Sequence, residues 1–185
     1  MTKWIGPEEA EYDERRELFN AMINKKPRII AACEGPADVR EALERAAQDR
    51  LPVAVRSGGH SVAGQSTNDD GLVIDVRPMK SIHIDATARR ARVEGGCTWA
   101  EFDVAAQEFG LATTGGRVST TGVSGLTLMS QRSARWVSHL GDEGDERIKA
   151  AFGAETYERL AQIKSEYDPG NVFAGNQNIR PKVSA

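Results

Sequence analysis

The sequence predicts an α+β fold, and three patterns along its 185 residues support this prediction. Between residues 28 and 55, two short apolar runs flank a helical stretch, which is the pattern of a βαβ unit. Further along, apolar and polar residues alternate in two short segments, as they do in half-buried strands. The last third of the chain has the period of a helix.

In the first third of the chain, we expect two helices and two strands. Residues 7–23 predict a charged, amphipathic helix, because Leu18, Phe19, Met22 and Ile23 would then share one face. Strands are expected at 28–33 and 53–55, with a helix at 37–49 between them. Prolines at positions 36 and 52 mark the start and the end of that helix.

Three more strands are expected, at 72–76, 81–85 and 90–94. A helix follows at 98–109, where Thr98 and Glu101 form a capping box. Residues 113–125 are rich in Gly, Ser and Thr and predict a loop, whereas 129–135 show no period. From residue 145 two helices are expected, the second ending at 168–171, and a polar, extended tail closes the chain.

Composition excludes several classes of partner. Twenty-four basic and 27 acidic residues give a net charge of −3 without a basic block, so neither nucleic acid nor an anionic membrane is expected as a partner. No apolar stretch approaches the roughly 20 residues of a membrane helix. The first twenty residues are densely charged and lack the apolar run of a signal peptide, which predicts a cytoplasmic protein. No metal site is predicted.

The two cysteines, Cys33 and Cys97, lie far apart in the sequence, and neither belongs to a CxxC motif. They could form one disulfide. Each lies in an apolar stretch, however, and cysteine is among the residues most often fully buried. This favours two buried thiols that act as small hydrophobic side chains.

Two glycine-rich loops are candidates for binding a ligand. The strand at 53–55 runs into Arg56-Ser57-Gly58-Gly59-His60-Ser61, where glycines let the backbone approach a ligand and successive N–H groups can form an anion-binding concavity. A plain β-turn is the alternative, since Gly-Gly is common between strands. The second loop, 113–125, follows a helix and contains neither a Walker motif nor GxGxxG. Two such loops suit a long cofactor.

His60 lies at the tip of the first loop, between glycine and serine. A lone histidine in a loop is usually just solvated. His83 falls in a predicted strand and His139 near a loop, so both are expected to be structural or exposed.

Taken together, these motifs resemble the flavin domain of the vanillyl-alcohol oxidase superfamily, and most of all its berberine-bridge-enzyme branch. The resemblance covers nearly the whole chain in the right order. It rests on Val55-Arg56-Ser57-Gly58-Gly59-His60-Ser61, Gly64, Gly71-Leu72-Val73-Ile74-Asp75, Gly95-Gly96-Cys97-Thr98-Trp99, Gly122-Val123-Ser124-Gly125-Leu126-Thr127-Leu128, Tyr167-Asp168-Pro169-Gly170-Asn171-Val172-Phe173 and Asn176-Gln177-Asn178-Ile179.

The resemblance implies a two-lobed FAD-binding domain, with a small βαβ lobe, a partial second sheet and a C-terminal helical segment. It also implies that residues 56–61 hold the pyrophosphate and that His60 bonds covalently to the 8-methyl group of the flavin. Some members add a second bond from a cysteine, but Val118 stands at that position here, beside Ser119, so single attachment is expected. The expected cofactor-binding residues are Arg56, Ser57, Gly58, Gly59, His60, Ser61, Gly64, Gly115, Gly116, Val118, Thr121, Gly122, Gly125, Asn176 and Asn178.

After Leu128 the sequence departs from this pattern, because members of the family continue into a Gly-Gly-Gly run and a large substrate domain. Here residues 129–137 lead directly into the closing segment, so the sequence resembles a family member with an internal deletion. The division expected is an N-terminal helical segment at 1–27, a partial FAD-binding domain at 28–128, the junction at 129–137 and the berberine-bridge-type segment at 138–185.

The function implied by the resemblance is an FAD-linked oxidoreductase of the oxidase type. Such an enzyme passes a hydride from a substrate C–H bond to flavin N5, and dioxygen reoxidises the flavin. A small-molecule substrate is expected if the chain is active. The alternative is a non-catalytic remnant that binds FAD or serves as an interaction domain, because the catalytic base usually lies in the missing part.

Overall fold

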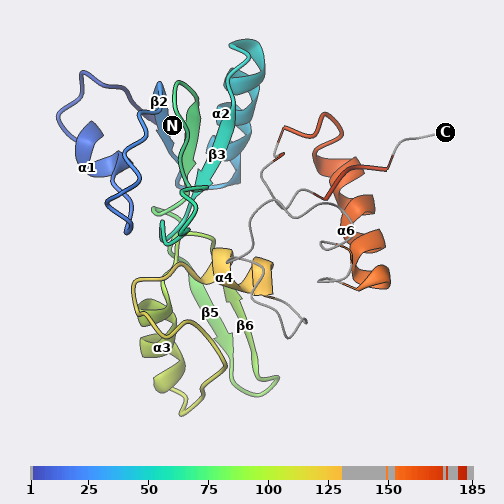
Figure 1. Cartoon of the computed structure of the whole chain (residues 1–185). Helices are drawn as coiled ribbons and strands as arrows, with labels where there is room; N and C mark the ends of the chain where they lie inside the picture. The colour runs from blue at the N-terminus through green and yellow to red at the C-terminus, as the bar shows by residue number, and fades with distance from the viewer. Residues whose placement is uncertain (1, 131–148, 150–152, 173, 175–178, 183–185) are drawn as a thin grey trace. The chain divides into compact units, whose positions relative to one another are not determined.

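The structure is a computed structural model that describes residues 2–130, 149, 153–172, 174 and 179–182. The chain divides into two compact units, residues 1–128 and 129–185. Figure 1 traces both units along the chain.

A four-stranded sheet forms the first lobe of the first unit. Its strands are β1 (Lys3–Ile5), β2 (Ile29–Ala32), β3 (Val53–Arg56) and β4 (Leu72–Asp75), in the order β1-β2-β4-β3. β2 and β3 both run parallel to β4, and β1 is antiparallel to β2. The predicted βαβ unit is confirmed, with β4 inserted between its two strands.

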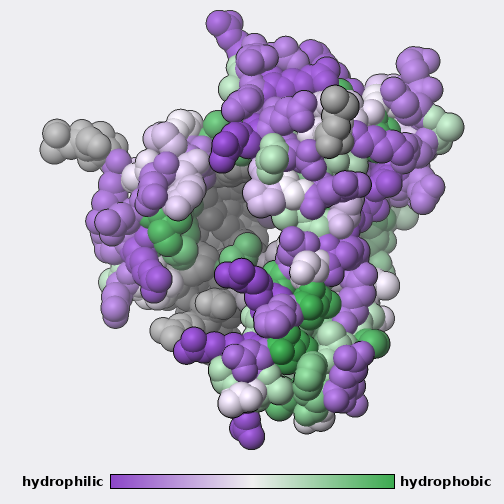
Figure 2. Space-filling model, turned by 180° about the vertical axis from the view of Figure 1, so that it is seen from behind, coloured by the Kyte–Doolittle hydropathy of each residue, from purple (hydrophilic) through white to green (hydrophobic). Residues whose placement is uncertain are grey.

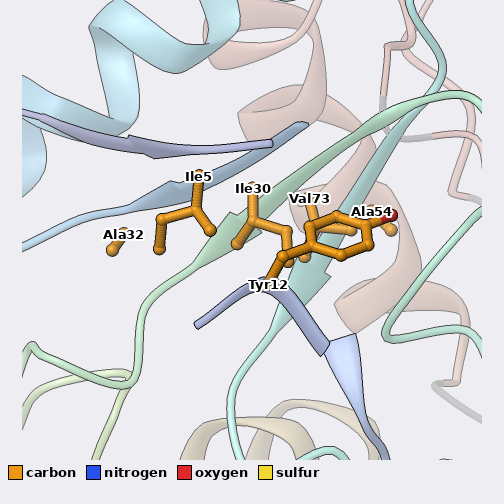
Figure 3. Close-up of a cluster of buried hydrophobic side chains, with 6 residues drawn as sticks. All are labelled: Ile5, Tyr12, Ile30, Ala32, Ala54 and Val73. Atoms are coloured by element: carbon orange, nitrogen blue, oxygen red, sulfur yellow. The ribbon is translucent and has the colours of Figure 1, made fainter. Parts of the chain in front are cut away.

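Two helices, α1 (Tyr12–Arg16) and α2 (Pro36–Gln48), lie on opposite sides of this sheet (Figure 1). Figure 3 shows the core on the α1 side, where the Tyr12 ring lies across the strands. The Tyr12 hydroxyl also donates to the carbonyl of Pro27 over 2.6 Å. This cluster consists of Ile5, Tyr12, Ile30, Ala32, Ala54 and Val73.

The expected helix at 7–23 is wrong in extent. Only 12–16 is helical, β1 precedes it, and Glu17 has the extended ψ of 136°. Tertiary contacts override the helical pattern, because Arg56 binds the carbonyls of Arg15 and Glu17 and so stops the helix there. Of the expected apolar face, Leu18 is buried, whereas Phe19 and Met22 are exposed.

The second lobe contains the antiparallel pair β5 (Ile82–Asp85) and β6 (Arg90–Val93) and the helix α3 (Trp99–Gln107). The alternation expected for β5 is confirmed, since Ile82 and Ile84 pack against the core of this lobe. The capping box of Thr98 and Glu101 is also confirmed at the start of α3. Cys33 and Cys97 are buried, free thiols, as the sequence favoured.

Apolar side chains also lie exposed on this lobe, where Figure 2 shows green surface on the lower part of the molecule. Val104, Phe109 and Val118 are 69%, 50% and 46% exposed.

The loop expected at 113–125 ends earlier than predicted, because α4 (Val123–Ser130) begins at Val123. Backbone contacts fix this start: Val123 N donates to the carbonyl of Cys97, and the Ser124 hydroxyl donates to that of Gly95. The sequence lacks a periodic apolar face here, so the helix was missed.

In the second unit, α6 (Ala154–Tyr167) ends at Asp168 as expected. Tyr157 and Ala161 are buried on it, with Leu160 and Ile179 packed against them. The tail is fixed to the helix by Lys182, whose N–H donates to the Ser165 hydroxyl over 2.7 Å. The helix expected from residue 145 lies largely outside the described residues.

Candidate cofactor site

The first glycine-rich loop leaves the carboxyl end of β3, at the edge where parallel strands carry ligand sites. Gly59 and Gly64 have φ of +71° and +67°, which glycine adopts without strain. Within the described part of the chain, no protein acceptor is found for the backbone N–H groups of residues 57–61. Such a run of free donors forms a concavity that fits a diphosphate.

The two glycine-rich loops meet at Gly58 and Gly122. A Cβ atom on Gly58 would lie 2.2 Å from the backbone nitrogen of Gly122, and one on Gly122 would lie 2.5 Å from that of Gly58. The hydroxyl of Ser57 donates to the carbonyl of Gly95 over 2.7 Å, which joins the turn before α3 to the same place. Three segments that are remote in the sequence thus meet at one junction.

His60 is half-buried at this junction and is contacted by two side chains. Its Nε2 lies 2.9 Å from the Thr120 hydroxyl, and its ring stacks on Phe19 with centroids 4.1 Å apart and an interplanar angle of 21°. Burial lowers the pKa of His60 below its usual 6.5, because desolvation disfavours the charged imidazolium. A neutral imidazole, which this favours, retains a nitrogen lone pair.

A cluster of charges lies beneath the first loop. The register of β3 and β4 pairs Arg56 with Asp75, and both side chains are buried on the α1 side. Arg77 binds Asp75 with Nε and Nη2, and Arg15 Nη1 lies 3.4 Å from the same carboxylate. Arg15 and Arg77 thus share the Asp75 carboxylate, Arg15 also pairs with Glu11, and the Arg56 guanidinium lies nearby at the carboxyl end of the parallel strands.

Arg56 uses its side chain for structure, because its guanidinium donates to the carbonyls of Arg15 and Glu17. Burial, together with the neighbouring charge of Arg77, lowers its pKa to about 10. Its Nε is buried without a partner in the described part of the chain and lies 3.5 Å from where a Cβ of Gly59 would be. The Arg56 side chain therefore supports the loop from below.

Other predicted residues close the first loop or pack against Trp99. Ser61 accepts hydrogen bonds from the N–H groups of Gly64 and Gln65, which closes the first loop. Gly115 and Gly116 pack on the Trp99 indole, where a Cβ on either would lie 2.5 or 2.6 Å from ring atoms.

Further along the second loop, Val118 is exposed and its carbonyl accepts from Thr121 N. Gly125 lies in α4, with open space where a Cβ would be. Asn176 and Asn178 lie outside the described residues.

Sequence reasoning missed the contacts of Phe19 and Thr120 with His60. Phe19 lies 41 positions before His60, in a stretch read as a helix face, and Thr120 was one of several hydroxyl residues in its loop. Neither position carries a local signal.

Among the described residues, no group of three or more His, Cys, Asp or Glu side chains could hold a metal ion. No helix in the same ranges has both the length and the apolar character to cross a membrane.

Family comparisons agree with this geometry. Residues 27–139 match the family described as FAD binding domain, and residues 139–180 match the family described as berberine and berberine like. The chain belongs to the FAD-linked oxidoreductases with this domain, and within them to the berberine-bridge-like group.

Two curated relatives illustrate the likeness. The chain is 37% identical over 124 residues to (R)-6-hydroxynicotine oxidase of Paenarthrobacter nicotinovorans, which covers 67% of this chain and 27% of the relative. It is 32% identical over 124 residues to an FAD-linked oxidoreductase of Bacillus subtilis, and this match covers 67% of the chain and 28% of the relative. The chain therefore spans about a quarter of the length of the curated relatives that it matches.

Solved structures confirm the fold class. The crystal structure of 6-hydroxy-D-nicotine oxidase from Arthrobacter nicotinovorans is similar with a TM-score of 0.66 at 36% identity, over 68% of this chain and 28% of that one. Aclacinomycin oxidoreductase is similar with a TM-score of 0.64 at 26% identity, over 70% of this chain and 27% of that one. The α+β fold expected from the sequence is thus that of an FAD-binding domain.

Proposed function

We propose that this chain holds FAD with the loop at 56–61 and carries it covalently on His60, as the cofactor-binding part of an oxidase-type FAD-linked oxidoreductase. The observation that carries the proposal is the run of free N–H donors at 57–61 beside the His60 imidazole, which Thr120 and Phe19 contact. FAD, when bound, supplies a hydride acceptor for a substrate C–H bond and passes the electrons on to dioxygen.

The residues of this chain bind and orient the cofactor. The N–H groups of the first loop would hold the diphosphate, and the guanidinium groups of Arg15, Arg56 and Arg77 lie beneath that loop. Gly58 and Gly122 keep the two loops in backbone contact, so that both flank one site.

Single attachment is part of the proposal. Val118 lies in the second loop with its side chain about half exposed, and an isopropyl group offers no nucleophile. Cys97 cannot replace it, because that thiol is fully buried and burial raises its pKa, which keeps it protonated.

The test is to denature protein purified with FAD and digest it. A yellow chromophore should remain on the peptide that contains His60 and on no peptide from 111–128. His60→Ala should keep only FAD that acid releases, whereas His83→Ala, at an exposed position in β5, should keep covalent flavin. Complete release of flavin by acid from a protein that was folded beforehand refutes the covalent link.

The second candidate is a non-catalytic FAD-binding remnant or interaction domain. A specific observation favours it, since the two family segments adjoin at residue 139 with no residues between them. A substrate domain in that place is thus absent from this chain. The two candidates differ in turnover, because only the enzyme would be reduced by a substrate.

A further inference from the structure

The ring of His60 is held from two sides by residues remote in sequence. Phe19 stacks on one face at 4.1 Å, and the Thr120 hydroxyl lies 2.9 Å from Nε2. We propose that Phe19 and Thr120 are positioning residues that hold the His60 imidazole for bonding to the flavin. This inference rests on the proposed function.

Thr120 selects which nitrogen of the ring can react. A neutral imidazole carries one N–H and one lone pair, and a hydroxyl can accept the N–H. When Nε2–H donates to the Thr120 hydroxyl, the lone pair lies on Nδ1. Nδ1 has no partner of its own within the described residues, so in this tautomer, which we assign to His60, Nδ1 is the nucleophile.

Phe19 fixes the plane of the ring. Its own position is set by the backbone, because Phe19 N donates to the Gly59 carbonyl over 3.4 Å and Arg56 binds the carbonyl of Glu17. Leu18 packs against the same loop, 3.4 Å from where a Cβ of Gly59 would be. The segment 15–20 thus crosses the attachment loop and presents the Phe19 ring to His60.

Both residues suit a clean test of function. Phe19 is 68% exposed, so its truncation removes little from the core. It also lies outside residues 27–139, the range matched by the FAD-binding family, so the site extends beyond that range. Thr120 is exposed as well, so replacing its hydroxyl with a methyl leaves no buried polar group unpaired.

Attachment oxidises the 8-methyl carbon and reduces the flavin ring. A bond from Nδ1 to the 8-methyl carbon replaces one methyl C–H bond. The two electrons of that bond pass to the flavin ring, together with the methyl proton and the imidazole proton, and dioxygen is the final oxidant. The chain contributes the orientation of Nδ1, because attack requires an aligned approach of about 3–3.5 Å.

The experiment measures how fast added FAD becomes acid-stable on apoprotein. Phe19→Ala and Thr120→Val should each slow attachment about fivefold or more, the factor that one aromatic stack or one net hydrogen bond supplies. Thr120→Ser retains the hydroxyl and should restore the rate. Met22→Ala, 89% exposed near Phe19, and Thr113→Val, exposed in the same loop as Thr120, should match the wild type.

A second readout needs no flavin. Nitrogen NMR of His60 in the apoprotein should show Nε2 protonated in the wild type and a mixture of tautomers in Thr120→Val. Wild-type attachment rates and spectra in both Phe19→Ala and Thr120→Val overturn the positioning roles alone. Absence of covalent flavin from the wild-type protein refutes the proposed function itself, so the two failures are distinguishable.

Discussion

Asp75 shows how much of the site depends on one buried side chain. It is fully buried and accepts hydrogen bonds from the backbone N–H, Nε and Nη2 of Arg77, with Arg15 nearby. Arg56 lies beside it in the parallel register and has a pKa lowered by burial. Without the Asp75 charge, three guanidinium groups would face one another at low exposure.

We therefore expect Asp75→Asn to destabilise the protein by about 3 kcal/mol or more, the usual cost of breaking a buried ion pair. Urea unfolding measures this loss. The control is Asp103→Asn at an exposed position of α3, which should change stability by no more than about 0.5 kcal/mol. Equal midpoints for the two variants would contradict the role given to Asp75.

Some individual residues of the candidate site could be predicted from the sequence. His60 was singled out by the resemblance of residues 55–61 and of the closing segment to a known family, because a lone loop histidine by itself is usually just solvated. The contacts around it were not predictable, because Phe19 reaches His60 only where the chain crosses the loop, and Arg56 pairs with Asp75 only through strand register. Those contacts depend on tertiary structure, which no local pattern encodes.

Among the elements, the junction of the two loops is the most constrained feature. Gly58→Ala would place a Cβ 2.2 Å from the Gly122 nitrogen and 2.9 Å from the Thr120 carbonyl. Backbone atoms cannot move aside as a flexible side chain can, so the loops must separate. We expect Gly58→Ala to cost about 1–3 kcal/mol in unfolding free energy and to abolish FAD uptake, as measured by urea titration and flavin absorbance.

Gly125 provides the matched control, because the space beside it is open and it lies within α4. Gly125→Ala should raise stability by up to about 1 kcal/mol, since alanine favours a helix, and its FAD uptake shows whether this expected cofactor-binding position contacts the cofactor. Loss of FAD from Gly125→Ala alone would mean that the cofactor approaches this position, and that the loop junction is not the limiting contact.

Strands β2 to β6 and helices α2, α3 and α6 were predicted, because local pattern and tertiary structure agree in them, whereas β1 was missed in a segment expected to be helical. Proline and glycine set the bounds of α2, and the Thr98 box sets the start of α3. The N-terminal helix was predicted too long, because Arg56 ends it from outside at Arg15 and Glu17. Helix α4 was missed, because its start depends on contacts with Gly95 and Cys97.

For the whole molecule, the short length of the chain bears on turnover more than on cofactor binding. The chain spans about a quarter of its curated relatives, and its two family segments adjoin at residue 139. The loop that we propose to hold the diphosphate lies within the first of these segments, and no residues separate this segment from the second.

Hydride transfer requires a substrate C–H bond held about 3–3.5 Å from its acceptor, and such positioning can supply on the order of 7–11 kcal/mol. Without a substrate domain most of that contribution is lost, and water weakens the remaining electrostatic stabilisation. We expect bound flavin to be reduced by dithionite and reoxidised in air, but not reduced at a useful rate by sugars, alcohols or alkaloids. Absorbance of the flavin band follows each reaction. Rapid, saturable bleaching by any of these substrates would establish an enzyme and exclude the remnant. A colourless protein that takes up no added FAD would instead leave only an interaction domain.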